Sequence, residues 1–257
     1  AAMMLLLLVT QAWRPPQRYR SGDVPTRSVV ARIDFSEIDS VATERLQDEA
    51  RAQVVVIYNH DPQPLMEKLE QLKGEVFQIL AAESFTKLNA DVKEAFFNRA
   101  PPDDPAMIDD FREDIFQNFR LAMEDDADLK QFEAALQRAF APQITDGMLE
   151  KLQHTEEEGT LLQIRVRPKG NENVAPRPVE TDKVRIATIL PQLEKRLKEE
   201  FKSEQVAEPV FFWLKTRLPT TLSVAPEATE AEREKAAEAV PPVEIKYKKG
   251  ETILAKG

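Results

Sequence analysis

Two stretches of this chain, 186 residues apart, carry nearly the same pattern of residues. Three residue types stay in step between them: Thr43 with Thr229, Ala50 with Ala236, and Val54 with Val240. Each stretch follows an extended, β-branched segment and leads into another, at residues 29–35 and 54–58 for the first and at 220–224 and 243–247 for the second. The pattern predicts a strand-helix-strand unit used twice. We expect one small mixed subdomain whose halves come from the two ends of the chain.

The long segment between the two repeats has the pattern of amphipathic helices. Apolar stripes run through residues 107–119 and 129–140, and Pro142 is expected to end the second of these two helices. Most phenylalanines of the chain fall in this segment, which predicts a helical bundle with an aromatic core. The clearest single stripe consists of Leu65, Leu69, Leu72, Val76 and Leu80.

The fold class expected is α+β and mainly α, with a helical bundle inserted into a small mixed β subdomain formed by the N- and C-terminal segments. Residues 160–167 alternate between apolar and polar side chains, as a half-buried strand does, and residues 190–201 have the period of another helix. The expected domains are residues 1–13 as the truncated end of a transmembrane helix, 14–60 as the N-terminal half of the α+β subdomain, 61–158 as the helical insertion, 159–219 as a strand, a loop and helices, and 220–257 as the C-terminal half of the subdomain.

The composition excludes several classes of function. The chain has 35 Lys and Arg against 45 Asp and Glu, a net charge of −10, and no basic stripe, so nucleic acid is not an expected partner. The absence of cysteine excludes disulfides, thiolate nucleophiles and sulfur-ligated zinc. The glycine-rich motifs that bind nucleotide phosphates do not occur, and we expect no cofactor.

The first residues form an uninterrupted apolar run, residues 3–9, followed by Trp13 and several arginines. Seven helical residues span only about 10 Å, against a hydrocarbon core of roughly 30 Å, so this run alone does not cross a bilayer. Because the sequence begins at Ala1, we expect a fragment whose start cuts into a longer membrane span, with Trp13 at the interface. The alternatives are a signal-peptide segment and an N-terminal core helix. The arginines favour a cytoplasmic flank, but long domains cross the membrane regardless of charge, which leaves the orientation open.

Both ends of the chain resemble one family, the extracellular domain of seven-transmembrane receptors that carry a cytoplasmic HD phosphohydrolase. The resemblance frames nearly the whole chain, whereas the middle supports it only by its helical pattern and its length. At the N-terminal end it rests on Trp13, residues 18–23 and 31–35, Asp39, Thr43, Ala50, Val54 and residues 56–61. At the C-terminal end it rests on Thr229, Ala236, residues 240–243 and 249–253, and Gly257.

The resemblance implies a transmembrane helix just before this domain and six more after it. It further implies an HD-type, metal-dependent phosphodiesterase that acts on cyclic di-AMP on the cytoplasmic side. The domain itself would lie at the cell membrane on the extracytoplasmic side. Its implied partners are its own transmembrane helices, the cytoplasmic HD domain and an unidentified extracytoplasmic ligand.

Several polar groups invite a chemical interpretation. The dipeptide His60-Asp61 spells the motif that names the HD fold, but a catalytic HD site needs further His and Asp ligands, and the only other histidine is His154. Capping of a helix by Asp61 before Pro62 explains the pair without chemistry. The acidic clusters at residues 103–104, 109–110 and 124–126 lack an EF-hand pattern, and capping and solvation account for them.

Two further segments carry open alternatives. Gln163, Arg165 and Arg167 would form a small positive face, with Lys183 and Arg185 on a following strand; it would be a solvated strand face or an anion site. Residues 211–214, Phe-Phe-Trp-Leu, would belong to the core or lie on the membrane surface, and the core is favoured because an exposed apolar patch is a liability.

The function expected from these observations is a non-catalytic, extracytoplasmic sensory domain that regulates a cytoplasmic HD-type cyclic-dinucleotide phosphodiesterase. The alternative is a membrane-anchored envelope scaffold that binds a protein or a polymer without signalling, and a hydrolase acting through paired carboxylates is a third class. No catalytic, cofactor-binding or metal-binding residue is nominated, and the ligand-binding residues are unknown from the sequence.

Overall fold

The computed structural model describes residues 28–98, 108–171 and 173–254. The chain divides into two compact units, of which unit 1 takes the two ends, up to Asp48 and from Glu238, and unit 2 takes Glu49–Ala237. The structure confirms the expected α+β class with mainly α content. None of the helices in the described ranges has the length and apolar character of a membrane span. The membrane helix expected in residues 1–13 lies outside these ranges.

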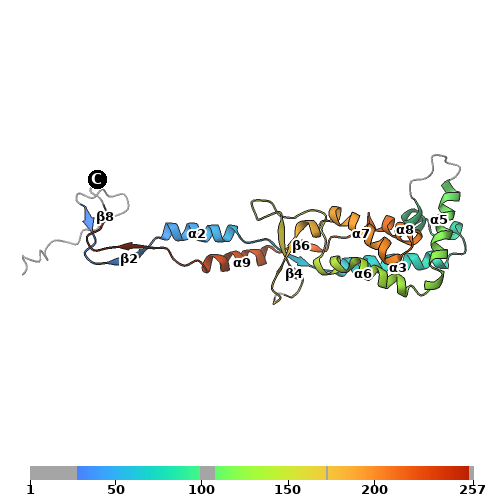
Figure 1. The fold of residues 1–257 in the computed structure, drawn as a ribbon, viewed down its shortest axis with the longest axis horizontal. Helices are drawn as coiled ribbons and strands as arrows, with labels where there is room; N and C mark the ends of the chain where they lie inside the picture. Colours follow the sequence, from blue (N-terminus) through green and yellow to red (C-terminus); the bar gives the residue numbers. More distant parts are fainter. Residues whose placement is uncertain (1–27, 99–107, 172, 255–257) are drawn as a thin grey trace, which may run out of the picture. The chain divides into compact units, whose positions relative to one another are not determined.

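Unit 1 is built from strands that pair the two ends of the chain. Strand β1, Val29–Val30, pairs with β8, Thr252–Leu254, and β2, Phe35–Ile38, pairs with β7, Glu244–Tyr247, both antiparallel. In Figure 1, β2 in blue runs beside a red strand from the C-terminal end. Phe35 stacks on Tyr247 across this ladder, with ring centroids 5.0 Å apart. The N- and C-terminal segments therefore fold against each other.

Unit 2 contains a mixed four-stranded sheet in the order β5-β4-β3-β6. Strand β3 is parallel to β4 and antiparallel to β6, and β5 is antiparallel to β4. Apolar side chains from one face of β3 and β4 pack into a small core, which includes Tyr58, Ile164 and Val166. The strands are β3, Ile57–His60; β4, Gln163–Pro168; β5, Arg177–Glu180; and β6, Leu222–Val224.

A lobe of helices forms the largest part of unit 2, and α3, α6, α7 and α8 gather in it (Figure 1). Its core is rich in aromatic residues, among them Phe96, Phe97, Phe116 and Trp213, all fully buried. Of the apolar segment at 211–214, Trp213 and Leu214 belong to this core and Phe211 packs against it. Trp213 also donates from Nε1 to Glu75 Oε2 at 2.7 Å. The helices are α3, Gln63–Ala81; α4, Ala90–Phe97; α5, Ile108–Ala122; α6, Lys130–Asp146; α7, Ile186–Phe201; and α8, Glu204–Leu214, with short 3₁₀ turns at Phe85–Lys87, Glu124–Asp126 and Thr181–Lys183.

The expected helices form, with three local differences. Ile79, and not Leu80, completes the buried stripe of α3, because Leu80 packs only at its margin. Phe111, expected on the apolar stripe of α5, is 37% exposed. Pro142 does not end α6, which continues to Asp146. Pro142 lies on an exposed face, where water can satisfy the carbonyl that proline leaves without a helical N–H donor.

The two repeats are strand-helix-strand units, as expected. The first consists of β2, α2 at Ser40–Ala52 and β3; the second consists of β6, α9 at Pro226–Glu238 and β7. Asp39 caps α2, since its Oδ1 accepts from the N–H of Ala42 at 2.9 Å. The strands are exchanged between the repeats: β2 pairs with β7 in unit 1, and β3 pairs with β6 in unit 2. The two pairs therefore belong to separate sheets rather than to one shared sheet.

Candidate functional site

In unit 2, the hydroxyl of Thr229 joins α9 to β3. Its Oγ1 accepts from the N–H of Ile57 at 3.0 Å and donates to the carbonyl of Ala225 at 3.0 Å. Ala225 lies opposite Ile57 in the ladder, but its carbonyl already accepts the helical N–H of Thr229. The threonine hydroxyl thus supplies the acceptor that the end of the ladder would otherwise lack, and we call this contact the Thr229 bridge.

Unit 1 contains the same arrangement. Thr43 Oγ1 accepts from the N–H of Val243 at 2.9 Å and donates to the carbonyl of Asp39 at 2.7 Å. The offset of 186 maps Thr43 onto Thr229 and also maps Ile57 onto Val243. The threonine retained in both repeats therefore has one physical role, the termination of a ladder at the start of a helix. The sequence pattern located both threonines but not this role.

His60, at the end of β3, is buried in unit 2. Its side chain is 7% exposed, and among the described residues its Nε2 finds no hydrogen-bond partner. Burial lowers the pKa of His60 and the nearby Arg177 lowers it further, against the opposing effect of the Asp61 and Asp146 carboxylates. His60 is therefore neutral near pH 7.

We expect unit 2 to lose stability as the pH falls below about 6.5, because the unfolded chain then protonates His60 while the folded chain keeps it neutral. The loss continues until the pH reaches the lowered pKa of the folded state, with a slope of at most about 1.4 kcal/mol per pH unit. Urea unfolding followed between about pH 7 and pH 5 checks this. His60→Gln removes this titration, and an equally steep loss in that variant would contradict the assignment.

The neighbour of His60 has a structural role. Asp61 Oδ1 accepts from the N–H of Gln63 in the first turn of α3 at 3.1 Å, and its Oδ2 pairs with Lys169 Nζ at 2.9 Å. These contacts lower the pKa of the Asp61 carboxyl. The structure brings no histidine to it besides the adjacent His60, since His154 is bound elsewhere, to Tyr58 and Thr160.

Tyr58 and His154 form a buried polar network behind the sheet. The Tyr58 hydroxyl accepts from the N–H of Gln153 at 2.9 Å and lies 2.8 Å from His154 Nδ1. His154 Nε2 lies 3.1 Å from the carbonyl of Thr160, which can only accept, so the network assigns the ring proton to Nε2. Burial raises the pKa of Tyr58, which keeps its hydroxyl protonated. The network fixes the segment that carries Gln153 and His154 against β3.

A pocket of about 430 Å³ lies between this segment and α9, within unit 2. Val56, directly before β3, and Val224 on β6 contribute apolar wall, and the Thr229 bridge lies at its edge. The remaining lining residues are Gln153, His154, Glu158, Pro226, Glu227, Glu230 and Arg233. The sequence did not reveal this site, because its residues come from a short strand, an irregular segment and one helix that have no common period.

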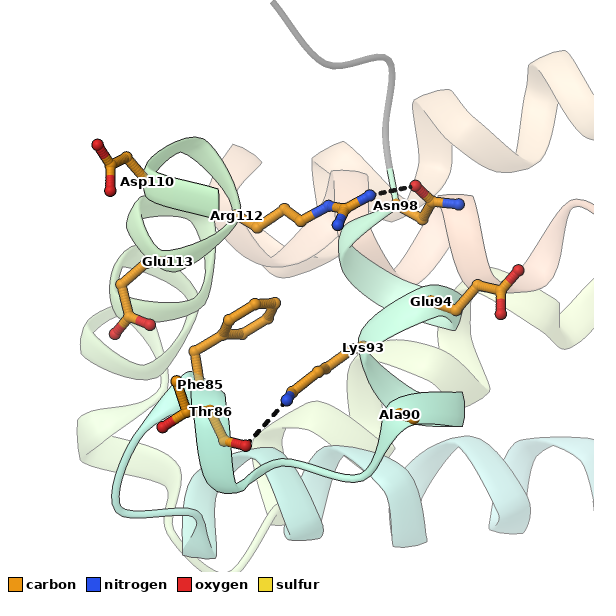
Figure 2. A pocket seen from close by; sticks show the side chains of 9 residues that line it. All are labelled: Phe85, Thr86, Ala90, Lys93, Glu94, Asn98, Asp110, Arg112 and Glu113. Carbon is orange, nitrogen blue, oxygen red and sulfur yellow. Dashed lines mark hydrogen bonds between the residues drawn. The ribbon is translucent and has the colours of Figure 1, made fainter. Parts of the chain in front are cut away.

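A second pocket, of about 640 Å³, lies among the first 3₁₀ turn, α4 and α5. Figure 2 shows Lys93 turned toward the Thr86 carbonyl, which it reaches at 2.9 Å, and Arg112 toward Asn98 at 2.7 Å. The carboxylate of Glu94 points away from the hollow (Figure 2). Its lining includes Asn98 and Asp110, between which the chain passes through residues outside the described ranges, so we assign no ligand to it.

The acidic clusters are placed as follows. The buried carboxylate of Asp126 caps α6, since Oδ1 and Oδ2 accept from the N–H groups of Gln131 and Phe132 at 3.0 and 2.7 Å. Residues 103–104 and the side chain of Asp109 are outside the described set. Within that set, no three His, Asp or Glu side chains come together as a metal site would require.

The basic face of β4 is paired within the protein. Arg165 contacts Glu232 at 3.4 Å and the carbonyl of Pro176 at 3.2 Å, and Arg167 Nε donates to Asn59 at 2.8 Å. The expectation that Lys183 and Arg185 lie on a following strand is wrong. Lys183 ends a 3₁₀ turn and Arg185 is the N-cap of α7, because the chain turns directly after β5.

A comparison with protein-family models matches residues 20–257 to one family, described as 7TM-HD extracellular (7TMR-HDED). The comparisons with curated proteins and with solved structures found no match. The match confirms the resemblance carried by the two ends of the chain. The matched family is an extracellular domain, in agreement with a domain on the outer side of a membrane, and it is not the HD catalytic domain.

Proposed function

The chain belongs to the 7TM-HD extracellular family, and from this premise we propose that it is the sensory domain that regulates a cytoplasmic HD-type phosphodiesterase acting on cyclic di-AMP. Its ligand would be extracytoplasmic, and its partners would be its own transmembrane helices and the HD domain. The observation that carries the proposal is the pairing of the two chain ends in unit 1. Strands next to both ends share two ladders, β1 with β8 and β2 with β7.

This pairing supplies a physical route for a signal. If each end continues into a membrane helix, as the resemblance implies, a shift of one ladder strand moves its partner, because backbone hydrogen bonds fix their register. Asp39 N–H, for example, donates to the Val243 carbonyl at 2.8 Å, and Ala31 N–H to the Glu251 carbonyl at 2.8 Å. A ligand biases such an equilibrium only through its difference in affinity between the two states.

A disulfide across the β2–β7 ladder tests the coupling in the full-length membrane protein. Ile38 and Glu244 are register partners, and both are exposed. The next pair along the ladder, Asp39 with Val243, is hydrogen-bonded. Ile38 and Glu244 therefore form a non-hydrogen-bonded pair, the type in which the side chains of the two strands lie closer together. The sequence contains no cysteine, so Ile38→Cys with Glu244→Cys introduces the only cysteines in this domain.

We expect oxidation of the double variant to change the rate of cyclic di-AMP hydrolysis by about fivefold or more, and reduction to reverse the change. Each single-cysteine variant, treated with the same oxidant, is the matched control. Equal rates in the oxidised and reduced double variant would contradict coupling through this ladder. If the rates were equal and the disulfide-linked domain retained an envelope protein or polymer, the scaffold alternative would replace the proposal.

A further inference from the structure

We propose that the pocket beside α9 binds a small organic cation with an apolar body. The inference deepens the proposed sensory function by naming a ligand class, and it rests on that function only for the consequence of binding. Four observations carry it: the apolar wall of the pocket, the excess of carboxylates at its rim, the internal pairing of its one guanidinium, and its contact with the Thr229 bridge.

The wall of the pocket is apolar and preformed. Val56, directly before β3, is 3% exposed, and Val224 on β6 and Pro226 at the start of α9 line the hollow with it. Gly159 packs closely against Val56, since an added Cβ at this glycine would come within 2.8 Å of Val56 Cγ2. The volume of about 430 Å³ falls within the usual size of small-molecule sites.

The rim of the pocket is negative. Glu158, Glu227 and Glu230 line it against a single guanidinium, that of Arg233. The positive charge of Arg233 is already engaged, since Nη1 lies 3.3 Å from Glu230 Oε2 and Nη2 donates to the Glu158 carbonyl at 2.6 Å. Because Glu230 is paired with Arg233, the carboxylates of Glu158 and Glu227 remain as the excess negative charge, which disfavours an anionic ligand and complements a cation.

Helix chemistry alone does not explain this arrangement. Glu227 lies in the first turn of α9, where the helix dipole favours an acid. Glu230, however, lies beyond the first turn, and Glu158 comes from the opposite wall, where its carboxylate accepts from the N–H of Thr155 at 2.8 Å. Carboxylates from two separate elements therefore converge on one apolar wall, as recognition of a cation with an apolar body requires.

The pocket is also placed where occupancy affects the connection between α9 and the sheet. Thr229 and Val56 line it, and Val56 directly precedes Ile57, whose N–H the Thr229 bridge holds. On the other wall, Gln153 Oε1 accepts from the N–H of Val224 at 3.0 Å. A ligand that touches these groups stabilises the arrangement of α9, β3 and β6 in which they converge.

The first repeat does not create this site. The offset of 186 maps Val224 onto Ile38 and Glu227 onto Val41, which are 60% and 76% exposed. Position 41 therefore carries valine where the pocket has an acidic side chain, and the apolar side chain of Ile38 is not covered. The pocket therefore depends on the segment that carries Gln153, His154 and Glu158, which belongs to the inserted part of the chain.

The test is a titration of the full 257-residue chain with 3-phenylpropylamine and with its uncharged counterpart 3-phenylpropan-1-ol. We expect the amine to bind about tenfold more tightly than the alcohol, because only the amine gains charge-assisted hydrogen bonds to the rim carboxylates. Calorimetry measures the affinities. Amide hydrogen exchange at Val224 locates the site, since occupancy should slow its exchange.

Glu227→Gln is expected to reduce amine binding to the level of the alcohol, and Glu227→Lys to abolish it. Glu227 is exposed, so these variants fold. The matched control is Glu156→Lys, which changes the same charge on the neighbouring exposed segment but does not line the pocket. The control should bind the amine within about twofold of the wild type.

Equal affinity for amine and alcohol would refute the cationic class, and unchanged amine binding in Glu227→Lys would refute the site. The site would also be refuted if neither probe slowed the hydrogen exchange of the Val224 amide. Binding is measured without the phosphodiesterase, and the disulfide test is measured without the probes. Failure of the ligand assignment and failure of the proposed coupling are therefore distinguishable.

Discussion

Replacement of Gly147 by alanine is expected to destabilise unit 2 by about 4 kcal/mol, from backbone strain and overpacking together. Gly147 ends α6 with φ of 81° and ψ of −178°, a region that only glycine occupies readily. An added Cβ would lie 2.7 Å from Leu222 and 2.9 Å from His60. Both neighbours are buried at the junction between the sheet and the helical lobe, where little room exists for them to move.

Two other glycines separate the causes of this loss. Gly170 has φ of 75° but no atom within 4 Å of an added Cβ, so Gly170→Ala should show the strain alone, about 1 kcal/mol. Gly74 lies inside α3 with open space around it, and Gly74→Ala should stabilise the protein by about 0.5–1 kcal/mol. Urea unfolding of the three variants measures the differences. A Gly147→Ala variant as stable as the wild type would show that the junction yields, contrary to this account.

The fold could be predicted where the sequence carries a local period. The stripe from Leu65 to Val76 placed α3 correctly, because four of its residues face the core at helical spacing. The alternation of Ile164 and Val166 likewise identified β4. The repeat was visible because the same small set of residues recurs around Thr43 and Thr229.

Other features could not be predicted because they depend on tertiary contacts. Pro142 reads as a helix end, but solvent exposure lets α6 pass through it. Nothing in the local sequence shows that Gly147 must lie against Leu222, which is distant in the chain. The exchange of strands between the repeats is equally invisible, since β2 could pair with either of two later strands. The α9 pocket combines both difficulties, because its walls meet only after this exchange.

The second large effect is expected at Thr229. Thr229→Val keeps the shape of the side chain but removes the hydroxyl, which leaves the N–H of Ile57 without an acceptor. Ile57 is 1% exposed and Thr229 is 4% exposed, so water does not replace the lost group. An unsatisfied buried N–H costs about 2 kcal/mol, and we expect the variant to lose that much stability. Thr229→Ser keeps the hydroxyl and should retain most of the stability of the wild type.

The equivalent change in the first repeat provides the matched comparison. Thr43→Val removes the acceptor of the Val243 N–H, but both residues are partly exposed, so water can bind the freed group. The expected loss is about 0.5 kcal/mol, confined to unit 1. Hydrogen exchange at the amides of Ile57 and Val243 reports each bridge separately. Equal losses in the two variants would mean that burial does not set the strength of these bridges. The Thr229 contact should therefore stabilise the chain before β3 more strongly than the equivalent Thr43 contact stabilises the chain before β7. The strand β7 belongs to the ladder on which the proposed coupling acts.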